Sequence, residues 1–374
     1  MNQSIHTGSL EENQPLLSGS KGDLKEFNLG SQRSSKGPKR EKMSVIDTAL
    51  TLVASTIGGE IVAVPYAIYR MGIYLGGFTI ILVAILSHTS NMMYLRIKDV
   101  TPVHLESIFE LAYILLGRWA IYAVCTIQYV LNYGQIVLYY IIIGETIANV
   151  IASFFFDSDV NKSQSEMKEL LKLEPAWTQI LAHKAATIIF VGILLLSVIF
   201  MRKLRELKQL SYIFMAVMVL FFGLFIAELF INGGNVALSY SDVNHVKFDH
   251  RLITAFSIIV FTYVVQFQVF PAFTELKNRS NERFAKASIV SVVIETAAYL
   301  LIGLTAILMF GPDQLKPDVL DNLATRPGTL SIAIRLVFCL LLIFDVPFLF
   351  FATKEQSLVL HDELINHSIS KRID

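Results

Sequence analysis

The sequence predicts an all-α polytopic membrane protein, from its low charge, its hydropathy and the spacing of its apolar runs. Hydrophobic residues make up 54% of the 374 residues and charged residues only 17%, with a mean hydropathy of +0.56. Soluble domains carry about 25% charged residues, so this chain has too little polar surface to cover a water-soluble globule. Apolar runs of about 20 residues, enough to cross a bilayer core about 30 Å thick, recur along the chain, and the sustained alternation of a membrane barrel is lacking.

Residues 1–42 are predicted to be a disordered cytosolic tail, because they are rich in Ser, Gly, Lys and Glu and hold no apolar core of a signal peptide. About eight candidate spans follow. The third is too long for an upright crossing, so we expect it to tilt strongly or to extend beyond the bilayer. The spans lie near residues 44–69, 73–95, 118–155, 180–200, 209–231, 251–272, 286–310 and 330–352.

Basic residues orient the chain, because loops rich in Lys and Arg resist translocation. They gather at 36–42, 96–98, 202–208 and 277–286, all on one side of an alternating topology. Both termini are therefore predicted to be cytosolic. Asn161, in an Asn-Lys-Ser sequon, falls on the opposite side as a candidate glycosylation site.

Several function classes find no support in the composition. Lys+Arg and Asp+Glu both total 31, so no basic footprint for nucleic acid is visible. Cys125 and Cys339 both lie in apolar runs, which argues against a disulfide framework or a thiolate metal site. His and acidic residues show neither metal-ligand nor catalytic spacing. We therefore expect no enzyme activity and no cofactor.

The first span carries helix-weakening residues at its middle. Gly58 and Gly59 are followed by Glu60 and then by Pro65, so the helix is predicted to break at mid-membrane. Backbone groups freed there must face protein, water or a ligand, which favours a cavity. The alternative is a tight glycine crossing between helices.

Acidic residues inside the predicted spans are costly unless they are protonated, paired or hydrated. Glu60 is the strongest candidate for a proton carrier or a counter-charge to a substrate amine, and the alternative is a protonated carboxyl that bonds freed backbone. Asp345 and Glu295 rank next, because they also lie deep within their spans.

The sixth span has a similar interruption. Gln266 and Gln268 precede Pro271, which is expected to free a carbonyl one turn back, near Phe267. Two broken spans at corresponding places are typical of inverted-repeat transporters, which hold their substrate between them.

Four stretches carry a resemblance to the amino acid/auxin permease family, which includes neutral and vacuolar amino acid transporters. TIGGEIVAVPYA at 56–67 resembles its first-span glycine motif. Val260 to Pro271 with ELKNRS at 275–280 resembles the sixth span and the following turn. Gly134 with YYIIIGE at 139–145 is similar to the third span, and Val346-Pro347 with Lys354-Glu355 is similar to the end of the eighth.

The resemblance implies a leucine-transporter-type inverted-repeat bundle and a transporter domain at 43–363. The first repeat would occupy 43–231 and a partial second repeat 251–352, followed by a short tail at 364–374. The family has eleven spans, so with about eight spans the chain is expected to be C-terminally incomplete.

The resemblance also implies a membrane symporter that moves amino acids by secondary active transport. Substrate would be bound by unwound backbone at Ile57, Gly58 and Gly59, and opposite it by Phe261, Tyr263, Val264 and Gln268. Glu60 stands where the family usually has a second glycine, which suggests a narrower or proton-linked cradle.

Proton coupling is favoured over sodium. A sodium site in this fold would take hydroxyl ligands from the eighth span, and that span has no Ser or Thr between Ser331 and Thr353. A proton needs only a titratable carboxyl in an alternately hydrated cavity, which Glu60 or Asp345 could supply.

The tail sequence ENQPLL at 12–17 resembles an acidic dileucine signal, with Glu12, Leu16 and Leu17 as its recognised residues. It predicts an adaptor protein as partner and favours a vacuolar or lysosomal membrane over the plasma membrane. A non-transporting amino acid sensor or accessory membrane subunit is the alternative function.

Overall fold

The computed structural model describes residues 42–101, 105, 107–155, 185–186, 188–190, 192–193, 204–234, 246, 249–311, 314–326 and 328–373. Within this part of the chain the regular structure is helical, apart from one isolated bridge between Met43 and Leu276. The helices are α1 (Val45–Thr56), η1 (Gly59–Ala63), α2 (Val64–Met71), α3 (Ile73–Val100), α4 (Ile108–Leu116), α5 (Arg118–Phe155), α9 (Leu204–Asn232), α11 (His250–Phe261), η2 (Gln266–Gln268), α12 (Val269–Glu275), α13 (Asn281–Phe310), α14 (Val319–Leu323), α15 (Thr329–Asn366) and α16 (Ser368–Ile373).

The polytopic all-α class is confirmed in the described residues. Six segments are long and apolar enough to cross a membrane, and the bent pair 45–56 and 59–71 makes up to seven. These segments correspond to seven of the eight predicted spans, and the remaining one, at 180–200, lies largely outside the described residues. The predicted tail at 1–42 and the sequon at Asn161 also lie outside them, apart from residue 42.

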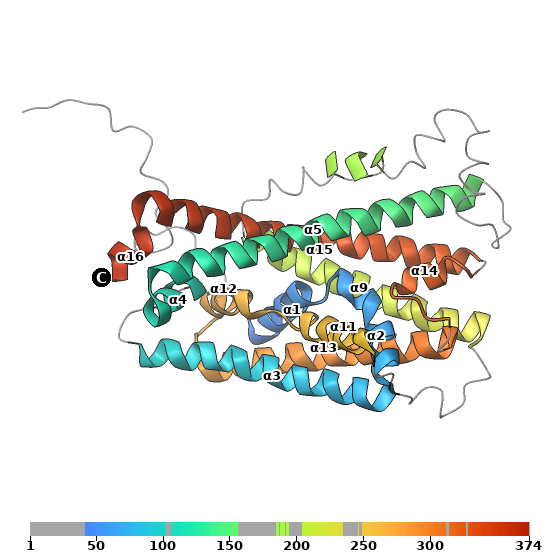
Figure 1. Cartoon of the computed structure of the whole chain (residues 1–374), viewed down its shortest axis with the longest axis horizontal. Coiled ribbons are helices and arrows are strands. Elements are labelled where there is room, and N and C mark those ends of the chain that lie inside the picture. Colours follow the sequence, from blue (N-terminus) through green and yellow to red (C-terminus); the bar gives the residue numbers. More distant parts are fainter. Residues whose placement is uncertain are drawn as a thin grey trace, which may run out of the picture. The chain divides into compact units, whose positions relative to one another are not determined.

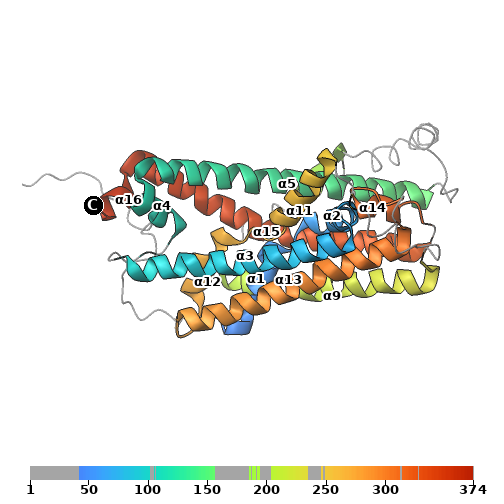
Figure 2. The same cartoon turned by 60° about the horizontal axis from the view of Figure 1, so that its bottom comes forward.

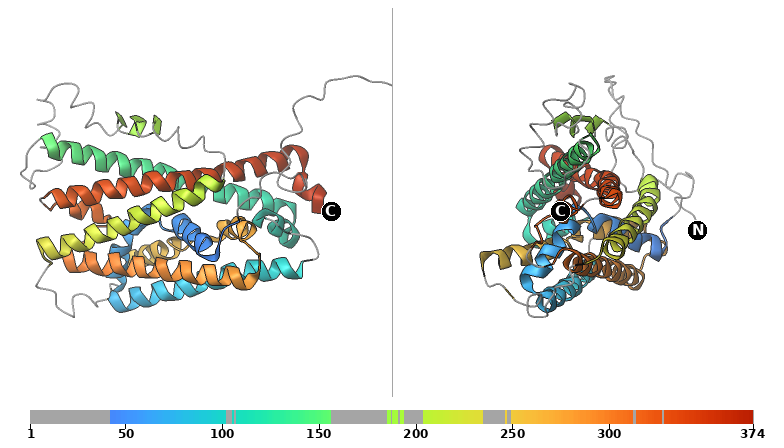
Figure 3. Two further views of the ribbon diagram at one scale, coloured as in Figure 1. Left: turned by 180° about the vertical axis from the view of Figure 1, so that it is seen from behind. Right: turned by 90° about the vertical axis from the view of Figure 1, so that its right-hand side faces the viewer.

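The long helices form the frame around the interrupted ones. Figure 1 shows α3, α5, α9, α13 and α15 running lengthwise, with α1, α2, α11 and α12 between them. Helices α5 and α15 stay side by side in Figures 1 and 2, as do α3 and α13, and both pairs are in contact. The right panel of Figure 3 looks along these helices.

Both interrupted spans have defined beginnings. Ser44 and Asp47 form a reciprocal capping box that starts α1, and Asp249 caps α11 by accepting the N–H of Arg251. The Met43 carbonyl accepts the N–H of Lys277, so the start of the first broken span is tied to the end of the second.

Helix α15 continues well past residue 352, where the sequence predicted its span to end. The Lys, Glu, Gln and Leu residues that follow are good helix formers, so their polarity marks the end of the apolar segment and not the end of the helix. The expected tail at 364–374 contains the end of α15 and all of α16. Ile369 of α16 is buried against Phe109, and Glu363 accepts the N–H of Ile369.

The segment between α13 and α15 is tied down by polar contacts. Asn322 accepts the N–H of Lys316 at 2.9 Å and donates to the Gln314 carbonyl at 2.6 Å. Arg326 donates to the carbonyls of Gly233 and Met309. This side chain therefore connects the C-terminal ends of α9 and α13. The short helix α14 is thereby held against η1 and α15.

Asp318 gives this segment a pH dependence. It caps α14 by accepting the Leu320 N–H at 2.7 Å, and burial raises its pKa to about 6, with smaller contributions from Asp321 and Glu145. The folded segment thus retains a proton that the unfolded segment, with a pKa near 3.8, releases. The stability of α14 is fully present below that lower pKa and declines as the pH rises through about 6.

We therefore expect slower hydrogen exchange of the 316–325 amides at pH 5 than at pH 7.5, after correction for intrinsic rates. Asp318→Asn keeps a capping side chain and should remove this difference. Asp321→Asn, on the exposed side of the same helix, should retain most of it. An equal pH dependence in the Asp318→Asn protein would contradict the assignment.

Candidate functional site

The first span breaks where the glycines predict. Helix α1 ends at Thr56, Gly58 has φ −134° and ψ −149°, and the chain resumes as η1 and α2 after a bend of 60°. Pro65 lies in the first turn of α2, where a missing N–H costs nothing, so it starts the second half of the span and does not cause the break. The prediction of a mid-span discontinuity at Gly58–Glu60 is confirmed.

Tyr139 of α5 packs directly against this break. Its hydroxyl oxygen accepts the main-chain N–H of Gly59 at 2.9 Å, and its side chain is fully buried. A Cβ on Gly58 would lie 1.8 Å from the Tyr139 hydroxyl, and one on Gly59 would lie 2.6 Å from the ring. The glycines therefore have two roles: they allow the helix to break, and they leave room for the Tyr139 ring to pack against the main chain.

The same hydroxyl joins the two acids that the sequence ranked as proton carriers. Tyr139 donates to Asp345 Oδ2 at 2.7 Å and lies 3.4 Å from Glu60 Oε2. Gln135, one turn earlier on α5, donates to both Glu60 oxygens at 3.2 Å and to Tyr139 at 3.0 Å. Two carboxyls, a phenol, an amide and a freed main-chain N–H thus form one network at the bend.

The second interruption lies slightly earlier than predicted. Helix α11 ends at Phe261, residues 262–265 are non-helical, and η2 and α12 follow. Pro271 falls in the first turn of α12, so it begins a helix, as Pro65 does. The carbonyls of Thr262 and Tyr263, rather than the one near Phe267, accept side-chain donors.

These carbonyls are satisfied from neighbouring helices. Tyr299 donates to the Thr262 carbonyl at 2.8 Å and Ser87 to the Tyr263 carbonyl at 3.1 Å. The Tyr263 hydroxyl lies 2.8 Å from the Thr296 hydroxyl, and its ring meets Tyr299 edge to face. Side chains of α3 and α13 therefore stabilise the non-helical segment of the second break.

A cavity of about 280 Å³ lies between the two interruptions. Glu60 lines it beside the first break, and Phe261 and Val264 line it beside the second. Helix α5 contributes a row of amides that the sequence analysis did not identify, namely Gln128, Asn132 and Gln135. They lie four and three residues apart, which places them on one helix face, and that spacing was the signal available in the sequence.

Gln356 of α15 locks part of this row. Its side-chain oxygen accepts from Asn132 at 3.1 Å, and its amide donates to Gln128 at 3.2 Å. The amide pairs connect α5 to α15 at a place that precedes Tyr139 on α5 and follows Asp345 on α15. The most extensive helix pairing in the described chain thus has a polar seam.

The remaining predicted residues lie near the cavity without lining it. Ile57, Gly58 and Gly59 are at the bend behind Glu60, and Ile57 is fully buried. Tyr263 points toward Thr296, and the cavity is lined by Gln266 where the sequence singled out Gln268. Glu295 is buried apart from the cavity and bonds Ser291.

The cavity is placed toward one end of the bundle. Tyr94 near the end of α3, Ile108 at the start of α4 and Val124 near the start of α5 also line it. Tyr94 contacts Phe270 of α12, on the side where α1 begins. On the opposite side of the breaks, α2 packs along α11 and α14 contacts η1. The cavity therefore lies on the side of the breaks where α1 begins, and α2, α11 and α14 cover the breaks on the other side.

Comparisons with known proteins fit this arrangement. A family model described as transmembrane amino acid transporter protein matches residues 41–362. Vacuolar amino acid transporter 5 of Saccharomyces cerevisiae is 24% identical over 310 residues, covering 80% of this chain and 63% of the relative. Amino acid transporter AVT6E of Arabidopsis thaliana is 24% identical over 332 residues, covering 83% and 62%.

Vacuolar amino acid transporter 7 of Saccharomyces cerevisiae is 35% identical over 101 residues, which is 26% of this chain and 20% of the relative. The chain spans less than two thirds of the length of each of these three relatives.

The contact of Tyr139 with the glycines can be tested by stability. Gly58→Ala should lower the melting temperature of the purified protein, because overpacking a rigid site costs about 1–3 kcal/mol. Gly134→Ala on α5 is the matched control, since no atom lies within 4 Å of its added Cβ, and it should be neutral or stabilising.

Tyr139→Phe removes the hydroxyl that a methyl group at position 58 would meet, so it should restore part of the loss when it is combined with Gly58→Ala. Equal melting temperatures for Gly58→Ala and Gly134→Ala would show that the close packing is absent.

Proposed function

Because the chain belongs to the transmembrane amino acid transporter family, we propose that it moves amino acids across a membrane by proton-coupled alternating access. The observation that carries the proposal is the network at the first break, in which Tyr139 connects the Gly59 main chain to Glu60 and Asp345. A substrate and a proton would therefore act on the same few atoms.

The interrupted backbone supplies groups suited to a zwitterion. A carboxylate is bound well by main-chain N–H groups at the start of a helix, and an amine by carbonyls at the end of one. In this proposal Ile57, Gly58 and Gly59 receive the substrate from one side. Phe261 and Val264 form the opposite wall, and Tyr263 and Gln268 act through the shape of the second break.

Proton coupling is supported by the shared phenol. Tyr139 has one hydrogen to donate, so Glu60 and Asp345 compete for it. Adding a proton to either carboxyl changes which oxygen Tyr139 bonds and whether it still accepts from Gly59. The protonation state would thus alter the backbone that binds substrate. Sodium coupling has less support, because α15 offers no hydroxyl between Ser331 and Thr353.

The position of the cavity on one side of the two breaks supports alternating access. The cavity lies on the side where α1 begins, which the distribution of basic residues predicts to be cytosolic, and the outer halves α2 and α11 lie on the other side of the breaks. Exposure of the same site to the opposite end would need α2 and α11 to separate. Such a movement is typical of transporters with two broken helices.

The proposed location is a vacuolar or lysosomal membrane, with both termini in the cytosol. Two relatives carry the word vacuolar in their names, and the tail carries the dileucine pattern. An adaptor protein that reads Glu12, Leu16 and Leu17 is the proposed partner.

Transport is tested with the full chain in liposomes under an imposed pH gradient. Radiolabelled amino acids, assayed singly, should accumulate with the wild-type protein. Glu60→Gln should lose the pH-driven accumulation, because the amide cannot carry a proton. Glu282→Gln, an exposed acid at the start of α13, is the matched control and should transport normally.

Binding of an amino acid without accumulation by the wild-type protein would favour a sensor or accessory subunit instead. Pumping by Glu60→Gln with unchanged pH dependence would remove Glu60 from the coupling mechanism.

The location is tested by replacing Leu16 and Leu17 with Ala in a tagged full-length protein. Imaging should show a shift from the vacuolar or lysosomal membrane to the plasma membrane, since an adaptor needs both side chains. Leu24→Ala with Leu29→Ala changes two leucines of the same tail and should leave the location unaltered. An unchanged distribution of the Leu16 and Leu17 variant would contradict the signal.

A further inference from the structure

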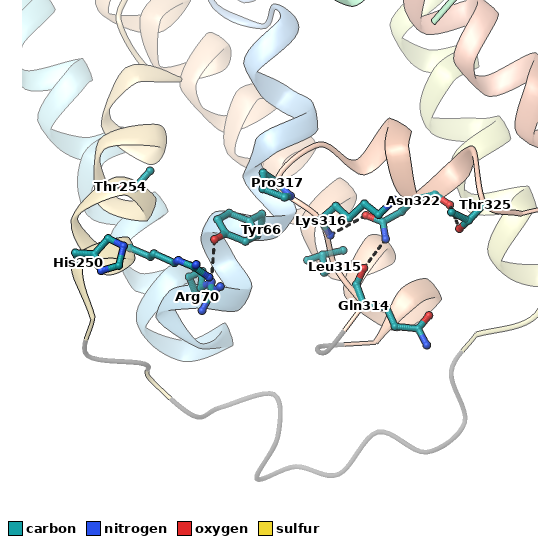
Figure 4. Close-up of a pocket in the computed structure, with 11 residues that line it drawn as sticks. Tyr66, Arg70, His250, Thr254, Gln314, Leu315, Lys316, Pro317, Asn322 and Thr325 are labelled. Atoms are coloured by element: carbon teal, nitrogen blue, oxygen red, sulfur yellow. Dashed lines mark hydrogen bonds between the residues drawn. The ribbon is translucent and has the colours of Figure 1, made fainter. Parts of the chain in front are cut away.

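A second and larger cavity lies on the covered side of the protein, away from Glu60. Its volume is about 860 Å³, and it is bounded by the end of α2, the start of α11 and the segment 314–325. In Figure 4 the side chains from α2 and α11 lie on one side of the opening and those from the 314–325 segment on the other, with Tyr66 between them. Three elements that are separate in the sequence therefore line one cavity.

The charged groups that line this cavity are all basic. Arg70 comes from α2, Arg251 from α11 and Lys316 from the segment before α14, and His250 lies beside them. The lining includes no acidic side chain among the described residues. Like charges that converge from three elements repel one another, so an anion in the cavity would stabilise this arrangement.

Only one of the three permanent charges is matched by a nearby acid in the described chain. Arg70 Nη1 lies 3.8 Å from Asp249, whereas the structure gives the Arg251 guanidinium and the Lys316 ammonium no carboxylate within ion-pair distance among the described residues. The Arg251 and Lys316 side chains are exposed to the cavity and to solvent. Within the described part of the chain, two positive charges are therefore left for a ligand.

Neutral donors complete the site. Tyr66 accepts the Arg70 Nε–H at 3.0 Å, and Arg70 also lies over the Tyr66 ring, so the hydroxyl hydrogen of Tyr66 remains available to a ligand oxygen. Thr254 adds a second hydroxyl from α11. Guanidinium, ammonium and hydroxyl groups around one cavity are the donors that bind phosphate-type oxygens.

From this geometry we infer that the cavity is a binding site for an oxyanion that carries two or more negative charges, such as a phosphate or pyrophosphate group. A monovalent carboxylate would neutralise only one of the two unmatched cations. The bound anion connects α2, α11 and the 314–325 segment, which are the elements that cover the transport site, so its occupancy favours the covered state of this side.

Basic residues at helix ends also act as anchors in the membrane interface, where they extend toward lipid headgroups. That role requires side chains that point outward singly, whereas these converge on a common cavity from three segments. A lipid phosphate that enters the cavity presents the same chemistry as a soluble phosphate, and the experiment separates the two sources.

The test uses the full chain in phosphatidylcholine nanodiscs, with pyrophosphate as the probe, at constant ionic strength and without divalent cations. Calorimetry should give saturable binding by the wild-type protein. Arg251→Gln combined with Lys316→Gln should weaken the affinity at least tenfold. Lys277→Gln combined with Arg279→Gln removes two exposed charges at the other end of the broken spans, and it should leave the affinity within twofold.

A structural readout accompanies the affinity. Pyrophosphate should slow hydrogen exchange in 249–254 and 314–326 and leave 275–283 unchanged. Each single variant, Arg251→Gln or Lys316→Gln, should lose part of this protection, which keeps the test decisive if the double variant is unstable. Equal affinities for the two double variants, or protection spread over both ends, would overturn the site.

Two competitors identify the ligand class and its source. Acetate at equal ionic strength should not displace pyrophosphate, and displacement by acetate would overturn the requirement for a multivalent anion. Nanodiscs that contain phosphatidic acid should weaken the apparent pyrophosphate affinity if a lipid headgroup enters the cavity. An unchanged affinity there assigns the site to soluble oxyanions.

Discussion

The contact between Tyr139 and the Gly58-Gly59 pair is the constraint on which the proposed transport site depends. Helix α1 ends just before the glycines, and the Tyr139 ring from α5 occupies the place where a side chain on either glycine would lie. The hydroxyl of that ring replaces the helical partner that the Gly59 N–H has lost. A buried polar group without a partner costs several kcal/mol in an apolar environment, so this bond makes the break tolerable and fixes its position.

Tyr139 also connects the helix break to titratable side chains. Through Tyr139, the bend of the first span is connected to carboxyls on η1 and α15, and through Gln135 to the amide face of α5. In the proposed mechanism, opening of the backbone and protonation of an acid would therefore be linked. The second break is held differently, because its carbonyls accept from Ser87 and Tyr299, which belong to the frame helices α3 and α13. One interruption is thus linked to titratable groups and the other to the frame.

The two cavities give the two ends of the molecule different chemistry. Polar neutral and apolar side chains line both cavities, but the charged lining of the cavity at Glu60 is a single acid, whereas that of the larger cavity on the covered side is basic. Arg326 and Asn322 hold the segment that separates the larger cavity from α9 and α13. The covered side is therefore an organised region whose charge differs from that of the proposed transport site.

The sequence by itself determined the helical membrane class, seven of the described spans, and the break at Gly58–Glu60, because these follow from apolar length and from local backbone propensity. It also identified Glu60 and Asp345 as candidate proton carriers, since a carboxyl in an apolar segment is costly unless it is protonated, paired or hydrated. Only the tertiary structure decided that Tyr139 joins these acids, that Pro65 and Pro271 begin helices instead of breaking them, and that Gln128, Asn132 and Gln135 line the cavity. Residues 60, 139 and 345 are far apart in the chain, and no local pattern specifies which side chains long-range packing will bring within hydrogen-bond distance.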